Sequence, residues 1–248
     1  MISVLMGLHR FDRYVFQAID SVLAQKYVCL ELIIVLNGKD ASCIAKKIRN
    51  NYLDEQRIRL VETPIAQLAH ALNVALSHAR YDYVARMDAD DVSHPDRLKR
   101  QLDYLTSNKL DLVGAAARLI DEEGREIGAR KPPSRDKINK LLPYKNCFIH
   151  PTIMAKRELL LEVGGYNSGF NSEDFDLWLR LRRRGGVCWD NMELCLLDYR
   201  IHDGTAQRKL LGYAEMSGLM LREFILTKSM IFFFAIWASI IKSFFGRR

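Results

Sequence analysis

The sequence predicts an α/β fold in which helices flank a mostly parallel central sheet. Through the first half of the chain, short runs rich in β-branched residues alternate with segments whose apolar residues recur every three or four positions. This alternation is typical of βαβ units, in which a helix connects two parallel strands. With 49% hydrophobic residues, 14 glycines and 6 prolines, the 248-residue chain can bury a full core, so disordered, fibrous and low-complexity classes are excluded.

Four strands and three connecting helices are expected in this first half. The strands are Ile2–Met6, Leu30–Leu36, Ile58–Val61 and Tyr83–Met87. The helices are Tyr14–Gln25, Ser42–Asn51 and Ala66–His78. Ligands of open parallel sheets bind at the carboxyl ends of the strands, so we expect the loops after Met6, Leu36 and Met87 to share one crevice.

The second half predicts a mixed arrangement rather than a continuation of the βαβ pattern. A strand from Asp111 leads into a hairpin turn at Asp121–Arg125, and Lys131-Pro132-Pro133 then interrupts regular structure. Further expected elements are a helix near Asp136–Leu142, a strand near Phe148–Ala155 and a helix from about Asp174 to Arg184. Loops at Ala129–Asp136 and Ala206–Tyr213 are expected to set specificity.

The net charge of +7 favours an anionic partner, but nucleic acid, sugar nucleotides and anionic lipid all qualify. The dense basic cluster at Arg180, Arg182, Arg183 and Arg184 is interpreted as a solvated helix face, and no nucleic-acid-binding signature accompanies it. The five cysteines form no C-x-x-C pair and are expected to be reduced and mostly buried. No secretory signal is recognised, so a cytosolic or cytosol-facing location is expected.

The C-terminal tail differs from the rest of the chain because Met230–Ile241 contains no charge. Lys228 and Lys242 bracket 13 residues, whereas a helix that crosses a bilayer needs about 20. An apolar helix with basic flanks suits the membrane interface, with an oligomer interface as the alternative. Residues 224–248 hold four basic residues and no acid, so +4 of the +7 surrounds this tail and no nucleic-acid partner is expected.

Two acidic motifs carry the candidate chemistry. The first, Arg86-Met87-Asp88-Ala89-Asp90-Asp91, follows the fourth predicted strand. Its three carboxylates repel one another unless a cation neutralises them, and Mg²⁺ or Mn²⁺ prefers such oxygen ligands. The alternative is a cap for the helix that begins near Pro95.

The second acidic motif, Ser172-Glu173-Asp174-Phe175-Asp176, starts a predicted helix. Acidic residues in a first turn complement the helix dipole, but a carboxylate held near a substrate hydroxyl also serves as a general base. A late histidine, His202, follows in Tyr199-Arg200-Ile201-His202. Together, these acids and the histidine favour sugar-phosphate chemistry over a purely structural role.

Residues 2 to 204 resemble the family 2 glycosyltransferases. The resemblance rests on Ile2–Met6, Ala18–Gln25, Glu31–Val35, Ala71-Leu72-Asn73, Ala85–Asp91, Pro95–Leu98, His150-Pro151-Thr152, Gly164-Gly165-Tyr166 and Glu173–Trp178. The Asp-x-Asp and Glu-Asp-Phe-Asp-Leu-Trp motifs lie about 85 residues apart, in the family's order. The resemblance implies a GT-A nucleotide-diphospho-sugar transferase fold over residues 1–204. Residues 205–248 would form a helical extension whose apolar segment, 229–245, associates with the membrane.

The same resemblance implies transfer of a sugar from a nucleoside diphosphate donor with inversion at the anomeric carbon. Asp88 and Arg86 would contact the nucleotide-sugar, and Asp88, Asp90 and His202 would form the site for Mn²⁺ or Mg²⁺. Asp174 would take the proton from the acceptor hydroxyl, with Glu173 beside it. The expected acceptor is a lipid-linked saccharide in surface polysaccharide synthesis, either O-antigen or capsule. The expected location is peripheral, on the cytoplasmic face of the inner membrane.

The chain departs from the family pattern at two places. Asn37 stands where the family usually has an acid that contacts the nucleobase, and an amide both donates and accepts, which leaves the base open. Gly7-Leu8-His9-Arg10 replaces the usual Pro-x-Tyr-Asn after the first strand, so Gly7 is assigned to the donor site. The alternatives are a sugar-phosphate nucleotidyltransferase, although no glycine-rich phosphate loop is present, and a degenerate membrane-docked binding module.

Overall fold

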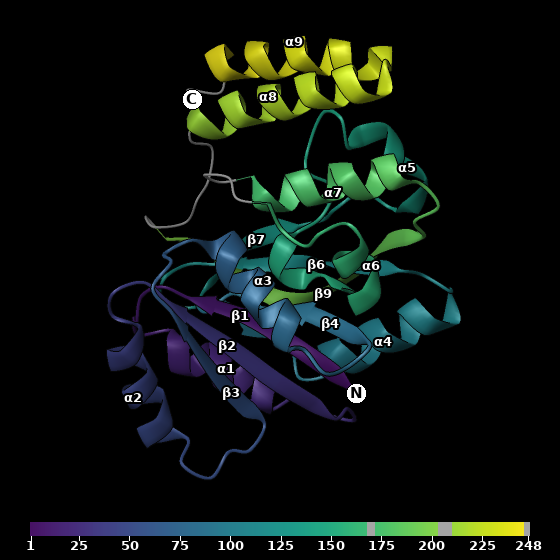
Figure 1. Cartoon of the computed structure of the whole chain (residues 1–248). Helices are drawn as coiled ribbons and strands as arrows, with labels where there is room; N and C mark the ends of the chain where they lie inside the picture. The colour runs from purple at the N-terminus through teal and green to yellow at the C-terminus, as the bar shows by residue number, and fades with distance from the viewer. Residues whose placement is uncertain (168–171, 203–209, 246–248) are drawn as a thin grey trace.

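A nine-stranded sheet forms the centre of the described chain, in the order β3-β2-β1-β4-β8-β6-β9-β5 with β7 paired to β6 (Figure 1). This computed structural model describes residues 1–167, 172–202 and 210–245. The first half contains β1 (Ile2–Leu8), α1 (Val15–Leu23), β2 (Leu30–Asn37), α2 (Ala41–Asn51), β3 (Ile58–Thr63), α3 (Leu68–His78) and β4 (Tyr83–Arg86). The expected strands and helices are confirmed, and their ends differ from the expected ones by at most two residues.

The second half adds strands of both directions. Its elements are β5 (Val92–Ser93), α4 (Arg97–Ser107), β6 (Leu112–Ile120), β7 (Glu126–Arg130), α5 (Arg135–Leu141), β8 (Met154–Lys156), α6 (Arg157–Glu162), α7 (Glu173–Arg184) and β9 (Trp189–Arg200). Because β8 is antiparallel to both β4 and β6, and β9 is parallel to β6, strands β1, β2, β3, β4, β6 and β9 share one direction. Six of the nine described strands therefore run parallel, as expected of a mostly parallel sheet.

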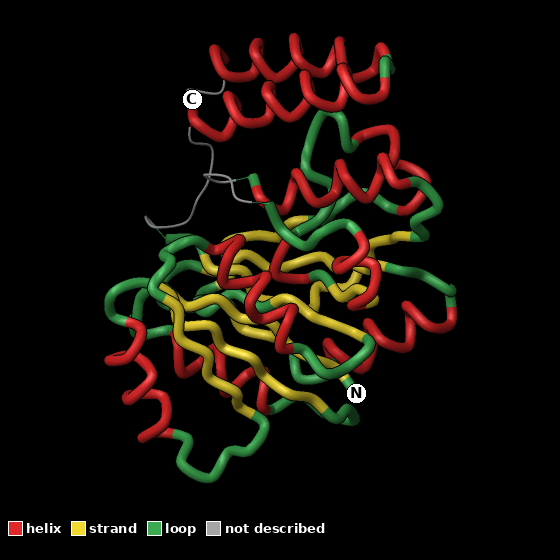
Figure 2. Tube along the Cα trace, viewed as in Figure 1, coloured by secondary structure: helices red, strands yellow, loops and turns green. Residues whose placement is uncertain are grey.

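Helices cover both faces of the sheet (Figure 2). One hydrophobic core joins alternate residues of β1 and β2 to α1, α2 and α4, and the other joins the intervening residues to α3, α6 and α7. All eight residues of β2 are buried, as expected for a strand covered on both sides. This two-sided burial explains why β1 and β2 are mostly apolar in the sequence.

Two expectations were wrong, and a third falls partly outside the described residues. The strand expected at Phe148–Ala155 is a 3₁₀ turn at His150–Thr152 followed by the short β8, because Pro151 cannot donate to a sheet ladder. The loop expected at Ala206–Tyr213 lies partly outside the described residues, and α8 already begins at Leu210. Of the five cysteines, all free, only Cys147 is fully buried.

The C-terminal end is a helical hairpin of α8 (Leu210–Thr227) and α9 (Met230–Phe245), which packs above α7 (Figure 1). The interpretation of the arginine cluster on α7 as a solvated face holds for Arg183 and Arg184, which are exposed, but is wrong for Arg180. Arg180 is buried and donates to the carbonyl oxygens of Val163 and Gly165, and Arg183 pairs with the fully buried Glu223 of α8. The arginines thus hold the turn before α7 and the hairpin beside it.

Helix α9 is apolar on two sides. Phe232 and Ala235 face inward, and Arg182 of α7 stacks on the Phe232 ring, whereas Phe234 and Trp237 are 58% and 55% exposed. The exposed apolar residues of the hairpin are Leu221, Ile225, Leu226, Met230, Phe233, Phe234, Trp237 and Ile241. Among the described residues, none of the helices combines the length and apolar character needed to span a bilayer.

Candidate functional site

Three carboxylates converge directly after β4. Each of Asp88, Asp90 and Asp91 offers an oxygen that lies within 4.8 Å of the other two, and we call this group the aspartate cluster. Asp91 is buried, and both its burial and the charges of the other two aspartates raise its pKa well above the usual range. Burial and the charge of Asp90 raise the pKa of Asp88 as well. A hard divalent cation fits this all-oxygen donor set, since it would relieve the repulsion among the three side chains.

The end of β9 supplies the partners of the aspartate cluster. His202 Nε2 lies 2.9 Å from Asp90 Oδ2, so the structure brings together these two residues that sequence analysis assigned to one site. His202 contacts Asp90 but is not a member of the aspartate cluster, in which every pair of ligand oxygens lies within 4.8 Å. The Arg200 backbone nitrogen donates to Asp91 Oδ1 over 2.9 Å, and the Arg200 guanidinium donates to the Asp90 carbonyl oxygen over 2.9 Å. Strand β9 therefore fixes the aspartates as well as the histidine.

Arg200 also joins several loops at this edge of the sheet. Its guanidinium donates to the carbonyl oxygens of Asp121 and Glu122 and to Gln17 Oε1, and it stacks 4.2 Å from the centre of the Tyr14 ring. Arg200 was not among the site residues expected from the sequence. A basic residue two positions before the assigned histidine was the available signal, but nothing in the pattern indicated that its side chain turns inward.

Arg86 links the aspartate cluster to the second acidic motif. It is almost fully buried at the end of β4 and forms an ion pair with Asp88. Its positive charge also lowers the pKa of Glu173 and Asp174, against the larger effect of burial. Because the charge of one buried guanidinium acts on both groups of acids, the two motifs lie near each other in the fold.

Glu173 and Asp174, which we call the helix-start pair, lie in the first turn of α7. Asp174 Oδ2 accepts a hydrogen bond of 2.5 Å from Asn146 Nδ2, and Oδ1 accepts one of 2.6 Å from the Phe175 backbone. Burial raises the pKa of Asp174, and burial together with the charge of Asp174 raises that of Glu173 to about 7. A carboxylate with such a pKa can accept a proton near neutral pH.

Asn146 is a further residue of the site that sequence analysis did not identify. Besides its bond to Asp174, its Oδ1 accepts from the Phe148 backbone over 3.1 Å, which fixes the orientation of the amide. It lies in the irregular segment between α5 and the 3₁₀ turn, where no periodicity marks a functional residue.

Asn73 of α3 fastens the segment that precedes α7. Its side chain donates to the Tyr166 carbonyl oxygen and accepts from the Tyr166 nitrogen, each over 2.7 Å. Gly165 adopts φ +67°, and a Cβ there would collide with Asn73 Oδ1, so only glycine fits this turn. Two motifs 93 residues apart, Ala-Leu-Asn and Gly-Gly-Tyr, are therefore parts of one clamp.

The two residues assigned to the donor site in the early strands both lie within the sheet, where Asn37 is buried and Gly7 is partly exposed. Gly7 lies within β1 rather than after it, and a Cβ there would lie 2.9 Å from Leu68 Cδ1, so this glycine lets α3 approach the sheet. Asn37 ends β2 and is 4% exposed, and its carbonyl oxygen lies 3.1 Å from His9 Nδ1. Both positions lie at the carboxyl edge of the parallel strands, where the shared crevice was expected.

Comparisons with known proteins place the chain among glycosyltransferases by sequence. The family model described as "Glycosyl transferase family 2" matches residues 3–164. The chain is 48% identical over 226 residues to the O-antigen biosynthesis glycosyltransferase WbnJ of Escherichia coli, covering 91% of this chain and 89% of that protein. It is 30% identical over 213 residues to the UDP-Gal:alpha-D-GlcNAc-diphosphoundecaprenol beta-1,3-galactosyltransferase of Escherichia coli, covering 84% and 76%.

A solved structure shares the fold. The crystal structure of S. aureus TarS 1-349 in complex with UDP-GlcNAc superposes with a TM-score of 0.69 at 15% sequence identity. The match covers 90% of this chain and 65% of that chain, so it extends over most of the elements described above but less than two thirds of the larger protein.

Proposed function

The chain belongs to glycosyl transferase family 2, and we propose that it transfers a sugar from a UDP-linked donor to a hydroxyl of a lipid-linked saccharide in O-antigen synthesis. Its relative at 48% identity is named for O-antigen biosynthesis. Another relative, at 30% identity, is named for a UDP-Gal donor and a diphosphoundecaprenol-linked acceptor. The observation that carries the proposal is the pair of acidic groups on separate elements, with the buried Arg86 paired to Asp88 and its charge acting on Asp174.

The aspartate cluster suits the donor side of this reaction. Asp88, Asp90 and Asp91 would hold Mn²⁺ or Mg²⁺, which when bound neutralises charge on a diphosphate leaving group. His202 would orient Asp90 through its 2.9 Å contact. The raised pKa values of Asp88 and Asp91 agree with this role, because carboxylates crowded together gain most from a cation.

The helix-start pair suits the acceptor side. Asp174 would accept the proton of the attacking hydroxyl, held in place by Asn146 and the Phe175 backbone. Glu173 lies next to it and would order the acceptor or share the proton. An inverting displacement requires the base and the leaving group on opposite faces of the sugar, which two acidic groups from separate elements can provide. A nucleotidyltransferase or a degenerate binding module needs no such base, so the intact pair favours a glycosyltransferase.

We propose further that the enzyme works peripherally at the cytoplasmic face of the inner membrane. The exposed apolar residues of the α8–α9 hairpin and the cationic Lys242 beside them are typical of a helix that lies in the membrane interface. This assignment retains the expected division into a catalytic part, residues 1–204, and a C-terminal extension.

Two variants test the assignment of the two sides. Asp90→Asn and Asp174→Asn should each lower transfer of radiolabelled sugar to lipid-linked acceptors by at least about 100-fold, as removal of a transition-state contact does. Only Asp90→Asn should lose the Mn²⁺-dependent part of the melting-temperature increase caused by UDP, because Asp174 lies on the acceptor side. The exposed Asp103→Asn serves as the control. Wild-type turnover in either variant would remove that residue from the mechanism.

A further inference from the structure

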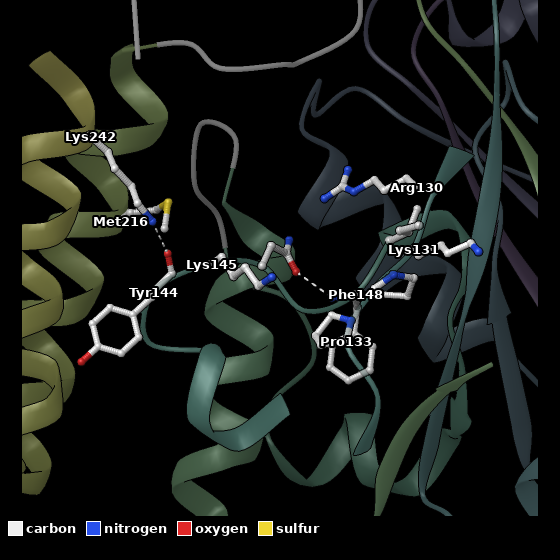
Figure 3. Close-up of a pocket in the computed structure, with 11 residues that line it drawn as sticks. Arg130, Lys131, Pro133, Tyr144, Lys145, Phe148, Met216 and Lys242 are labelled. Atoms are coloured by element: carbon white, nitrogen blue, oxygen red, sulfur yellow. Dashed lines mark hydrogen bonds between the residues drawn. The ribbon is translucent and has the colours of Figure 1, made fainter. Parts of the chain in front are cut away.

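A cavity of about 410 Å³ lies beside the helix-start pair, between the C-terminal hairpin and the segment after β7 (Figure 3). Its walls come from distant parts of the chain, and they include Pro133 and Phe148 on one side and Met216 of α8 on the other. The volume falls in the range of about 300–1,000 Å³ that is usual for ligand sites. Nothing in the mechanism described above uses this cavity.

Every charged side chain that lines the cavity among the described residues is a cation. They are Arg130, Lys131, Lys145 and Lys242, and we call the cavity the basic pocket. Figure 3 shows Arg130 and Lys145 extending toward the middle of the pocket from opposite walls, and Lys242 reaching in from α9. Within the described part of the chain, no carboxylate forms an ion pair with any of the four cations. Several positive charges around one cavity, with no negative charge among its described lining residues, favour an anionic ligand.

The basic pocket adjoins the acceptor side of the active site. Asn146 lines the pocket and donates to Asp174 Oδ2 over 2.5 Å, and the charge of Arg130 lowers the pKa of Asp174. A molecule in the pocket therefore lies one side chain away from the residue proposed as the base. The donor diphosphate is assigned to the aspartate cluster, so an anion in the basic pocket would belong to another molecule.

The pocket also adjoins the proposed membrane surface. Lys242 lies on α9 one residue after the exposed Ile241, and its ammonium donates to the Tyr144 carbonyl oxygen over 2.9 Å. Met216 brings α8 into the same wall. The pocket thus has an acidic catalytic pair at one end and the apolar hairpin at the other.

We propose that the basic pocket binds the diphosphate that joins the acceptor saccharide to its lipid, and this inference rests on the proposed function. Arg130, Lys145 and Lys242 neutralise the diphosphate, while the lipid follows the apolar surface of the hairpin. The first sugar then extends past Asn146 toward Asp174. Recognition of the acceptor would depend on the phosphorylated link as well as on the saccharide.

Binding can be measured separately from catalysis. We would titrate the full chain, in nonionic detergent with EDTA, with decyl diphosphate and in parallel with phosphatidylglycerol in mixed micelles. Without a divalent cation, the aspartate cluster repels a diphosphate, so calorimetry reports the basic pocket. Loss of one charge-assisted contact should weaken binding at least about tenfold in Lys145→Gln, and more in the double variant with Lys242→Gln. Lys140→Gln, an exposed lysine on α5 outside the pocket, is the matched control.

Each outcome decides the inference. Tight binding of decyl diphosphate that depends on Lys145 and exceeds binding of phosphatidylglycerol supports it. Binding within twofold of wild type in the double variant would place the diphosphate elsewhere and overturn it. Equal affinity for phosphatidylglycerol would make the pocket a general site for anionic lipid headgroups and also overturn it. Failure of the proposed function would appear differently, as absence of sugar transfer by a protein that still binds decyl diphosphate.

Discussion

Replacing Glu173 by glutamine should make the stability of the protein less dependent on pH. The folded environment raises the pKa of Glu173 from 4.5 to about 7, chiefly through burial and then through the charge of Asp174. Between these two values the folded state holds a proton that the unfolded state has lost. The contribution of Glu173 to stability is therefore greatest at low pH and is lost as the pH rises through about 7.

The size of the effect follows from the shift in pKa. At about 1.4 kcal/mol per pKa unit, a carboxylate forced to ionise in this site lowers the free energy of unfolding by about 3 kcal/mol at high pH. Glutamine cannot ionise, so the variant avoids this loss. We expect Glu173→Gln to gain about 2–3 kcal/mol relative to wild type between pH 5 and pH 8.

Urea unfolding of both proteins at pH 5 and pH 8, in EDTA, measures this difference. Glu158→Gln is the control, because Glu158 also lies in the first turn of a helix, α6, but is exposed. Its effect should be the same at the two pH values. If Glu173→Gln likewise changed stability equally at pH 5 and pH 8, the raised pKa of Glu173, and with it the role of burial in the helix-start pair, would be refuted.

Three further changes test other parts of the molecule. Asn73→Ala removes two hydrogen bonds to the Tyr166 backbone, so the free energy of unfolding measured in urea should fall by about 2 kcal/mol. An unchanged value would show that these two hydrogen bonds do not stabilise the turn. His202→Ala removes the partner of Asp90, so the affinity for Mn²⁺, measured by electron paramagnetic resonance, should fall about 10- to 100-fold. An unchanged affinity would show that His202 does not support the metal site. Phe234→Ser combined with Trp237→Ser should reduce co-sedimentation with anionic vesicles, and undiminished sedimentation would exclude α9 as the contact surface.

The first half of the fold was predictable because strands that are buried on both faces are mostly apolar in the sequence. Strands such as Leu30–Asn37 are mostly apolar, and the helices between them keep a regular apolar spacing. The positions of the two acidic motifs followed from the same pattern, since one ends a strand and the other begins a helix. The juxtaposition of Asp90 and His202 came from the resemblance to the family and not from any local signal.

Strand β9 escaped prediction for a physical reason. Trp189–Arg200 pairs with β6 through two register shifts near Ala116, so its apolar and polar residues do not alternate regularly. Asn146 and Arg200 act through tertiary contacts that no spacing reveals. Arg180 of α7 was misassigned because its partners, the carbonyl oxygens of Val163 and Gly165, lie in a turn that no spacing reveals. The ion pair of Arg183 with Glu223 was missed because the expected helical extension did not specify its contacts with α7.

The partners of the aspartate cluster have a consequence for the order of folding. Asp90 and Asp91 depend on His202 and Arg200, which follow them by 109 to 112 residues. Strands β1 to β4 lie within the first 86 residues and can pair early in synthesis, whereas contacts so distant along the chain close late. A nascent chain that ends before β9 carries all three aspartates but lacks the residues that hold them. The ability to bind a nucleotide-sugar should therefore arise only when the last strand is added. Catalytic activity would then report that the sheet has folded completely.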